Sequence, residues 1–363
     1  MLAPEDYMRR ALALAERGLY TTTPNPRVGC VIVDEAGEII GEGWTQPAGQ
    51  NHAEIQALLD AAARGKSVIG ATAYVTLEPC SHFGRTPPCC DAISSAGITR
   101  VVAALEDPNP LVSGKGFERL AAAGIAVTSG LLQDEARAIN EGFISRIVRG
   151  RPFVRLKIAA SLDGKTALAN GVSKWITSEA ARADAHHWRA RSCAILTGIG
   201  TVLADNPSMN VRAVQTPRQP RRIVLDSQLR TPADASILQG SNTLIVTASN
   251  NAKRRHELET TGAEILHLPA EDGRVDIVAL LPVLGQQGTN ELLVEAGAEL
   301  NAAFMQSGLV DEYLLYLAPT FLGDPARGLA MLPALETLEE RIELRFHSVE
   351  QVGEDLRILA RPT

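Results

Sequence analysis

The sequence predicts two α/β domains, and three observations support this prediction. The chain has 363 residues, which is long for a single domain. Short apolar runs typical of buried strands alternate with stretches of helical apolar spacing through both halves. A helical stretch at 135–148 leads into Arg149-Gly150-Arg151-Pro152, a sequence typical of a helix end and a linker. We therefore expect one domain at 1–146 and a second at 147–363.

In the first domain, helix and strand patterns alternate along the chain. Apolar residues recur at helical spacing from 5 to 17, and the segment 54–64 is rich in Ala and Leu. Apolar, β-branched runs between such segments predict strands that are largely buried. The strands expected here are 29–33, 73–77, 100–104 and 125–128, and the remaining helices are 91–96, 116–123 and 135–148.

The second domain begins with a new apolar strand pattern after Phe153. Its clearest helix is predicted at 179–191, and no internal repeat or low-complexity tract interrupts the domain. Strands are expected at 154–160, 194–197, 222–225, 243–247, 264–268, 291–294, 312–317 and 356–360.

Composition excludes several classes of protein. The formal charge of −7 argues against a nucleic-acid-binding surface, which needs a concentrated basic face. No apolar run approaches the roughly 20 residues that span a bilayer, and Asp6, Arg9 and Arg10 interrupt any secretory signal. Five unevenly spaced cysteines favour a reducing compartment. We expect a cytoplasmic protein with no nucleic-acid or membrane partner.

The chemistry of the first domain is indicated by His52-Ala53-Glu54, followed by Pro79-Cys80 and then Cys89. One imidazole and two thiolates favour zinc, and three protein ligands leave a fourth position open for catalysis. A water at such a position loses its proton near neutral pH. In zinc-dependent deaminases with this signature, the Glu moves protons and is not a ligand. Hydrolytic deamination of an amino-substituted ring is therefore the expected activity.

Alternatives to this zinc site remain open at the level of single residues. A lone His-x-Glu or Cys pair is more often structural, so the prediction depends on several elements agreeing. Pro79 would suit the first turn of a helix, whose N-terminus favours a thiolate at Cys80. Cys90 could replace Cys89, whereas His82 fits a substrate contact better than a metal ligand. A structural zinc protein would need a fourth ligand and a basic face, and the sequence offers neither clearly.

Motifs in the second domain are weak when taken alone. The segment 294–300 is a strand that runs through a small turn into a helix, and such a turn can offer backbone N–H groups to a phosphate. It is not a Gly-x-Gly-x-x-Gly fingerprint. Arg189 and Arg212 match phosphate oxygens, although a solvated position is equally expected for Arg189 on its predicted helix. Trp175 is by default a core residue.

Longer motifs resemble the bifunctional riboflavin-biosynthesis deaminase/reductase family. They are Thr23-Pro24-Asn25-Pro26-Arg27-Val28-Gly29, His52-Ala53-Glu54, the run from Thr76 to Cys89, Asp107-Pro108-Asn109-Pro110 and Gly114-Lys115-Gly116. The eight residues between Cys80 and Cys89 separate the chain from deaminases with a Cys-x-x-Cys pair. The resemblance implies an N-terminal cytidine-deaminase-like α/β/α domain and a C-terminal dihydrofolate-reductase-like α/β domain.

For the first domain, the resemblance implies a role for each matching residue. His52, Cys80 and Cys89 would bind Zn²⁺, Glu54 would be the general acid/base, and Asn25 would hold the substrate. The substrate implied is 2,5-diamino-6-(5-phosphoribosylamino)pyrimidinone. Arg85 would contact its phosphate or ribose, or would simply be a solvated loop arginine.

For the second domain, the resemblance implies reduction of the ribosyl side chain to a ribityl chain by NADPH. Substrate contacts would fall at Ser173, Arg189, Met209, Arg212 and Glu295, and Lys157 would polarise the opened sugar. NADPH contacts would fall at Ala159, Trp175, Thr201, Asp205 and Ser227, and in the turn formed by Gly297, Ala298, Glu299, Leu300, Asn301, Ala302 and Ala303.

Two residues of this turn depart from the expected small or hydroxyl-bearing types. A carboxylate at Glu299 would repel a pyrophosphate if it pointed inward, so we expect it to point outward and the backbone to bind. Asn301 departs in the same way. These departures support an alternative, a deaminase whose second domain is a non-catalytic scaffold. The family also implies a homo-oligomer, a dimer or larger.

Overall fold

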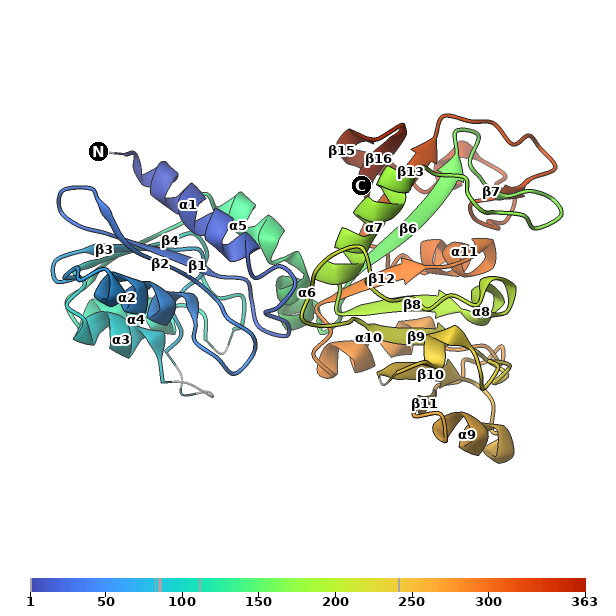
Figure 1. Ribbon diagram of the computed structural model, residues 1–363, viewed down its shortest axis with the longest axis horizontal. Coiled ribbons are helices and arrows are strands. Elements are labelled where there is room, and N and C mark those ends of the chain that lie inside the picture. The colour runs from blue at the N-terminus through green and yellow to red at the C-terminus, as the bar shows by residue number, and fades with distance from the viewer. Residues whose placement is uncertain (1, 82, 84–86, 111, 241) are drawn as a thin grey trace. The chain divides into compact units, whose positions relative to one another are not determined.

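The computed structural model describes residues 2–81, 83, 87–110, 112–240 and 242–363. The chain divides into two compact units, Met1–Gly150 and Arg151–Thr363, and each is an α/β structure (Figure 1). The expected boundary between residues 146 and 147 falls within helix α6 (Glu141–Arg149). In the described part of the chain, we find no helix with the length and apolar character needed to cross a membrane.

The first unit is built around a sheet with the strand order β2-β1-β3-β4-β5. Strand β1 is antiparallel to β2 and β3, whereas β3, β4 and β5 are parallel. Figure 1 shows α1 and α5 on one face of this sheet and α2, α3 and α4 on the other, which is an α/β/α arrangement. The strands are β1 (Gly29–Val33), β2 (Ile39–Trp44), β3 (Thr72–Val75), β4 (Arg100–Ala103) and β5 (Ala126–Ser129), and the helices before α6 are α1 (Pro4–Glu16), α2 (Ala53–Ala63), α3 (Cys89–Ser95), α4 (Lys115–Ala122) and α5 (Gln133–Ile139).

Helix α2 lies unusually close to β2, because two glycines of that strand leave room for it. A Cβ atom at Gly43 would lie 2.3 Å from the Ala53 carbonyl oxygen, and one at Gly41 would lie 2.3 Å from that of Ala57. Real Cβ atoms do not approach backbone so closely, so only glycine permits this packing. The close contact fixes the start of α2 and therefore the position of His52 at its N-terminus.

Three features of the first unit differ from the expectations. Strand β2 was not predicted, because its glycines weaken the strand pattern. The helix expected at 135–148 is interrupted at Asn140, whose side chain binds backbone instead. No helix begins at Pro79 among the described residues; Cys89 begins α3 instead.

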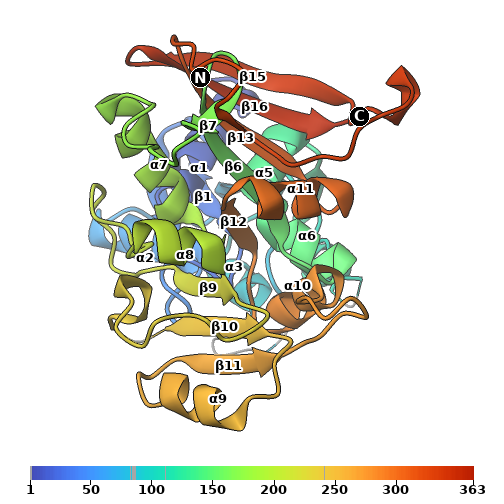
Figure 2. The same cartoon turned by 90° about the vertical axis from the view of Figure 1, so that its right-hand side faces the viewer.

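The second unit contains a longer sheet with the order β11-β10-β9-β8-β12-β6-β13-β16-β15. The strands from β11 to β13 are parallel, and β16 and β15 add an antiparallel edge. Figure 2 shows α7 and α8 to one side of the sheet and α10 and α11 to the other. Its strands are β6 (Phe153–Ser161), β8 (Ala194–Gly198), β9 (Arg221–Leu225), β10 (Thr243–Thr247), β11 (Glu264–His267), β12 (Glu291–Glu295), β13 (Glu312–Ala318), β15 (Leu344–Val352) and β16 (Asp355–Pro362). Strands β7 (Lys165–Ala167) and β14 (Arg327–Gly328) form a small separate pair, and the α-helices are α7 (Glu179–Arg191), α8 (Ile199–Asp205), α9 (Ala252–Glu259), α10 (Ile277–Gln286) and α11 (Ala298–Gln306).

The parallel strands bring their carboxyl ends to one edge of the sheet, where open α/β sheets bind ligands. Strands β8, β9 and β12 are followed at this edge by Thr201, Ser227 and Gly297 respectively. Fully buried side chains such as Leu156, Leu196 and Val294 hold the strands together. The fold thus gathers residues that are distant in sequence at one edge.

Candidate functional site

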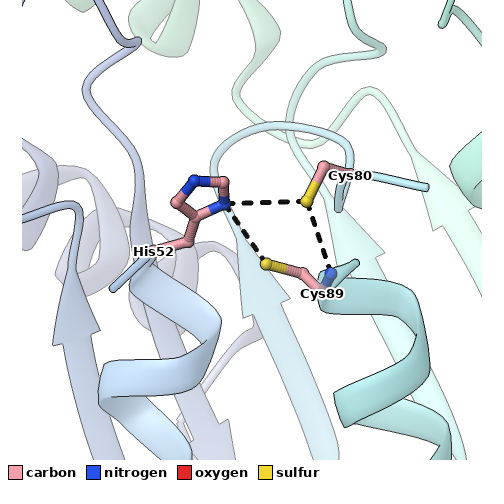
Figure 3. A group of neighbouring side chains, drawn as sticks. All are labelled: His52, Cys80 and Cys89. Atoms are coloured by element: carbon pink, nitrogen blue, oxygen red, sulfur yellow. Dashed lines mark hydrogen bonds between the residues drawn. The ribbon is translucent and has the colours of Figure 1, made fainter. Parts of the chain in front are cut away.

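Three side chains of the first unit converge on one point, as Figure 3 shows. His52 caps the N-terminus of α2, Cys80 follows β3, and Cys89 is the first residue of α3. The His52 Nδ1 atom lies 3.6 Å from the Cys80 Sγ atom and 3.4 Å from the Cys89 Sγ atom. The backbone N–H of Cys89 donates to the Cys80 Sγ atom at 3.3 Å.

This geometry fits a zinc ion. Tetrahedral zinc with ordinary Zn–N and Zn–S bond lengths places its N and S ligands about 3.6 Å apart. The two measured His–Cys separations match that value. Among the His, Cys, Asp and Glu side chains of the described residues, these three form the group that is close enough together to hold a metal. Three protein ligands leave one tetrahedral position for a substrate or water.

The two cysteines differ in their acidity. Hydrogen bonds from the Cys89 thiol and from His52, together with that from the Cys89 backbone N–H, lower the pKa of Cys80 to about 4 against the effect of burial. The hydrogen bond with Cys80, together with burial, raises the pKa of the Cys89 thiol. Cys80 is therefore the readier thiolate of the pair.

A cavity of about 450 Å³ is lined by two of the three ligand residues, His52 and Cys80. Glu54 and Asn25, both predicted from the sequence, lie in its wall, and Asp107 and Asn109 belong to a motif whose role was left unassigned. Its full lining is Pro24, Asn25, Pro26, Val28, Thr45, Ala48, Gly49, Gln50, His52, Glu54, Leu77, Glu78, Cys80, Asp107, Asn109, Val112, Phe143 and Ile147.

Glu54 lies in the first turn of α2 and is almost completely buried, with 4% of its surface exposed. Burial, reinforced by the negative charge of Cys80, raises the pKa of its carboxyl to about 7. A carboxyl with such a pKa can both accept and release a proton near neutral pH. Its position and its acidity therefore suit a proton carrier.

The remaining cysteines near this site have other roles. Cys90 is buried and its thiol donates to the Pro79 and Gly116 carbonyl oxygens, so it points away from the cluster. Cys30 is buried in β1 and belongs to the hydrophobic core. His82 and Arg85, considered above as substrate contacts, lie outside the described residues.

A second cluster of charged side chains lies in the other unit, at the end of β12. The Glu295 carboxylate accepts two hydrogen bonds from Arg189, at 2.6 Å from Nε and 2.9 Å from Nη2. The Lys157 Nζ atom lies 3.7 Å from the same carboxylate. Burial alone would raise the pKa of Glu295, but the charges of Arg189 and Lys157 lower it to about 2.

The same cluster includes further residues predicted from the sequence. The Met209 Sδ atom lies 3.9 Å from Arg189 Nη2, and Arg189 Nη1 donates to the Asn210 carbonyl oxygen at 3.2 Å. Arg212 follows on the same loop and its backbone N–H donates to His186 Nδ1 at 3.4 Å. The structure thus joins Lys157, Arg189, Met209, Arg212 and Glu295, whereas no described contact links Ser173 to them.

The expected cofactor residues lie on loops around the strand ends. A Cβ atom at Gly297 would lie 4.0 Å from the Thr201 Oγ1 atom, so the loops after β8 and β12 are adjacent. Asp205 pairs with Lys174 at 3.2 Å. Ser227 follows β9 and its carbonyl oxygen accepts from Thr247. Ala159 is partly buried in β6.

Trp175 is not the core residue that its type suggests. Its surface is 67% exposed, and the Arg182 guanidinium lies 4.5 Å from its ring centroid. An exposed aromatic face held by an arginine is available to a planar ligand. The exposure therefore agrees with the cofactor contact that the family resemblance implies.

Gly297 caps helix α11, and the first turn of a helix has backbone N–H groups without helical partners. Glu299 is exposed, in keeping with the outward direction expected for it. Asn301 is 1% exposed, and its side-chain amide donates to the Leu329 carbonyl oxygen at 2.8 Å. Leu300 packs close to Gly198, and Ala302 is buried. The Asn301 side chain is thus engaged with backbone, whereas the Glu299 side chain is exposed.

Sequence reasoning missed three residues that hold these sites together. His186 was not singled out, although it lies three residues before Arg189 and hence on the same face of α7. Glu78 was quoted only as part of a motif, and Asn140 was read as helix interior. Their roles depend on backbone partners that are distant in sequence, which no local pattern reveals.

Comparison with known proteins agrees with these two sites. The pattern named "Cytidine and deoxycytidylate deaminase zinc-binding region" matches residues 1–105, and the "RibD C-terminal domain" matches residues 152–358. The riboflavin biosynthesis protein RibD of Escherichia coli strain K12 is 49% identical over 97% of each chain. The chain belongs to the RibD family.

Solved RibD structures share the whole fold. RibD of Acinetobacter baumannii is 44% identical, with a TM-score of 0.91 over 99% of each chain. A Thermotoga maritima protein described as a diaminohydroxyphosphoribosylaminopyrimidine deaminase/5-amino-6-(5-phosphoribosylamino)uracil reductase is 33% identical, with a TM-score of 0.89 over 99% of each chain.

Membership of the RibD family determines the class of activity. The chain is a bifunctional enzyme of riboflavin biosynthesis, with a zinc-dependent deaminase domain and an NADPH-dependent reductase domain. The match over residues 152–358 does not favour the alternative of a non-catalytic scaffold.

Proposed function

We propose that the first unit deaminates 2,5-diamino-6-(5-phosphoribosylamino)pyrimidin-4(3H)-one. We further propose that the second unit reduces the ribosyl side chain of the product, giving 5-amino-6-(5-phosphoribitylamino)uracil. The observation that carries the proposal is the cluster of His52, Cys80 and Cys89, two of which line a cavity together with Glu54. The described activity of the Thermotoga maritima relative supports the choice of substrate.

In the deaminase, His52, Cys80 and Cys89 hold the zinc ion. When bound, zinc polarises water and stabilises negative charge that develops during attack on the ring. Glu54 would move two protons in turn through its carboxyl oxygens. It would accept the first from the attacking water and deliver it to the ring nitrogen. It would accept the second from the hydroxyl group then on the ring carbon and deliver it to the departing amine. The Asn25 amide, also in the cavity wall, orients the pyrimidine.

In the reductase, bound NADPH supplies the reducing equivalents. Lys157 lies beside Glu295, and its ammonium group donates to the oxygen of the opened sugar. The Arg189 guanidinium already binds Glu295 and the Asn210 carbonyl oxygen, so its main contribution is to orient Glu295 toward the substrate. Arg212 has an exposed side chain and is the better phosphate contact, alongside Met209 and Ser173.

The loops at the carboxyl ends of the strands would hold NADPH. The turn 297–303 offers backbone N–H groups to the pyrophosphate at the start of α11. Trp175 offers an exposed aromatic face. Ala159, Thr201, Asp205 and Ser227 complete the contacts.

The test follows both reactions in purified protein supplied with the diaminopyrimidinone ribosyl phosphate. We expect wild type to release ammonia and to oxidise NADPH. Glu54→Gln should lower ammonia release at least about a hundredfold, the usual contribution of a general acid/base, while zinc content stays as in wild type. NADPH oxidation should return when the variant receives the deaminated intermediate.

Two results would contradict this proposal. Wild-type protein with bound zinc that releases no ammonia would exclude the proposed deaminase substrate. Ammonia release without NADPH oxidation, even with the deaminated intermediate, would exclude the proposed reductase reaction.

We also propose that the enzyme is a cytoplasmic homo-oligomer. Strand β15 forms one edge of its sheet and carries exposed apolar side chains, Leu344, Phe346 and Val349, which a second copy would cover. No disulfide joins the described cysteines, which suits a reducing compartment. Sedimentation at a monomer mass across the micromolar range would exclude the oligomer.

A further inference from the structure

The Glu78 side chain is nearly buried, with 4% of its surface exposed, and it binds backbone from a distant part of the chain. Its Oε2 atom accepts from the backbone N–H groups of Asp107 and Gly114, each at 3.0 Å. Its Oε1 atom accepts from the backbone N–H of Gly116 at 2.7 Å. Three amide donors around one carboxylate form strong, charge-assisted hydrogen bonds.

The backbone gathered by Glu78 belongs to the cavity wall. Asp107, Asn109 and Val112 all line the cavity beside Glu54 and His52. Inside the same stretch, the Asp107 carboxylate accepts from the backbone N–H of Asn109 at 2.8 Å, and the Ser113 hydroxyl donates to Glu106. The polar groups that Asp107 and Asn109 present to the cavity are therefore placed by the hydrogen bonds to Glu78.

Close backbone packing makes this arrangement hard to replace. A Cβ atom at Gly116 would lie 2.2 Å from the Pro79 carbonyl oxygen, so this wall is pressed against the residue after Glu78. The buried Cys90 thiol donates to both the Pro79 and the Gly116 carbonyl oxygens. Glu78 thus links a zinc-ligand segment, which continues to Cys80, to the part of the cavity wall that contains Asp107.

We infer that Glu78 is a positioning residue for substrate recognition in the deaminase. It holds the segments 107–110 and 112–116 so that Asp107 and Asn109 meet the polar edge of the pyrimidine. This inference rests on the proposed deaminase function. It assigns to Glu78 no contact with the reacting atoms and no part in metal binding.

The test compares wild type with Glu78→Gln. Glutamine has nearly the same shape as glutamate, but its amide NH₂ replaces one of the two accepting oxygens and would face backbone N–H groups. We expect KM for the diaminopyrimidinone substrate to rise roughly tenfold, the effect of losing one charge-assisted hydrogen bond, while kcat changes much less. Zinc content and NADPH oxidation with the deaminated intermediate should stay as in wild type.

A second readout does not depend on activity. Hydrogen exchange followed by mass spectrometry should show faster exchange in peptides covering 105–117 of Glu78→Gln, and unchanged exchange in peptides of α2. The matched control is Glu42→Gln, which removes surface ion pairs with Arg10 and Arg64 in the same unit and lies outside the cavity wall. It should change neither KM nor exchange at 105–117. If Glu78→Gln yields no soluble protein, Glu78→Asp replaces it, because a shorter carboxylate keeps the charge but not the reach.

The outcomes separate this inference from the proposed function. An unchanged KM, with or without faster exchange, overturns the positioning role. Loss of zinc also overturns the inference, since Glu78 would then support Cys80 and not the wall that contains Asp107 and Asn109. If wild type itself releases no ammonia, the proposed function has failed, and the exchange data alone decide whether Glu78 orders the wall.

Discussion

His186 shows how a single buried side chain makes the reductase unit sensitive to pH. It is 6% exposed, and its Nδ1 atom accepts from the backbone N–H of Arg212. Burial, together with the positive charges of Arg189 and Arg212, lowers its pKa to about 4, while the negative charge of Glu295 acts in the opposite direction. The imidazole is therefore neutral in the folded protein at pH values where an unfolded chain would bind a proton.

A stability measurement follows from this shift. Because the pKa of His186 is lower in the folded protein, the neutral imidazole contributes to the free energy of unfolding. This contribution is fully present above the unfolded-state pKa of about 6.5 and is lost as pH falls toward 4. Wild type should therefore lose more stability than His186→Gln between pH 7.5 and 5. Urea unfolding followed by tryptophan fluorescence at both pH values tests this. Equal losses in the two proteins would show that His186 does not titrate differently on folding.

At single positions, residue type alone was a poor guide to exposure but a good guide to chemistry. Trp175 is of a residue type that is usually buried, yet it is exposed and its ring lies against the Arg182 guanidinium. Arg189 on a helix would ordinarily be solvated, yet it binds Glu295, which is 106 residues away. The zinc ligands were predictable because few residue types bind zinc and because each ligand occurs in a short, recognisable motif. The partners of Arg189 were not, because tertiary contacts determine them.

At the scale of elements, most buried strands were predictable, whereas the edge strands β2 and β15 were not. The expected strands 29–33 and 243–247 coincide with β1 and β10, since buried strands are runs of Val and Ile. Strand β15 is exposed along most of its length, and charged and polar residues separate its apolar ones, so it lacks the continuous apolar run of a buried strand. The interruption of the helix at Asn140 was equally hidden, because it depends on backbone pairing with Arg27.

The packing of α2 on β2 leads to a prediction at this scale. Gly43→Ala would place a methyl group 2.3 Å from the Ala53 carbonyl oxygen, so the start of α2 must move away from the strand. We expect a loss of stability of about 1–3 kcal/mol, as for other overpacked sites, and weaker zinc retention because His52 moves with the helix.

Zinc content after dialysis and the unfolding temperature would check this prediction. Gly200→Ala is the control, since nothing lies within 4 Å of a Cβ atom there. The prediction fails if Gly43→Ala retains zinc as firmly as wild type does.

At the scale of the whole molecule, each proposed site is built entirely within its own unit. His52, Glu54, Cys80 and Cys89 precede Gly150, whereas Lys157, Arg189 and Glu295 follow it. Removal of zinc by a chelator should therefore abolish ammonia release but leave NADPH oxidation with the deaminated intermediate intact. Assays of both reactions before and after chelation, followed by restoration with zinc, test this. A parallel loss of NADPH oxidation would show that the reductase also depends on the metal.

Asn140 also bears on where the chain can be cut. Its side-chain amide pairs with both backbone groups of Arg27 at 2.8 Å, and α6 beyond it supplies Phe143 and Ile147 to the cavity wall. A fragment ending at residue 105, where the zinc-binding pattern stops, would keep every metal ligand and Glu54. It would lack Phe143 and Ile147 of the cavity wall. It would also lack the Asn140 amide that binds the Arg27 backbone, two residues after Asn25. The segment beyond residue 105 therefore supplies part of the cavity wall and of the core, although the three metal-ligand candidates all precede it.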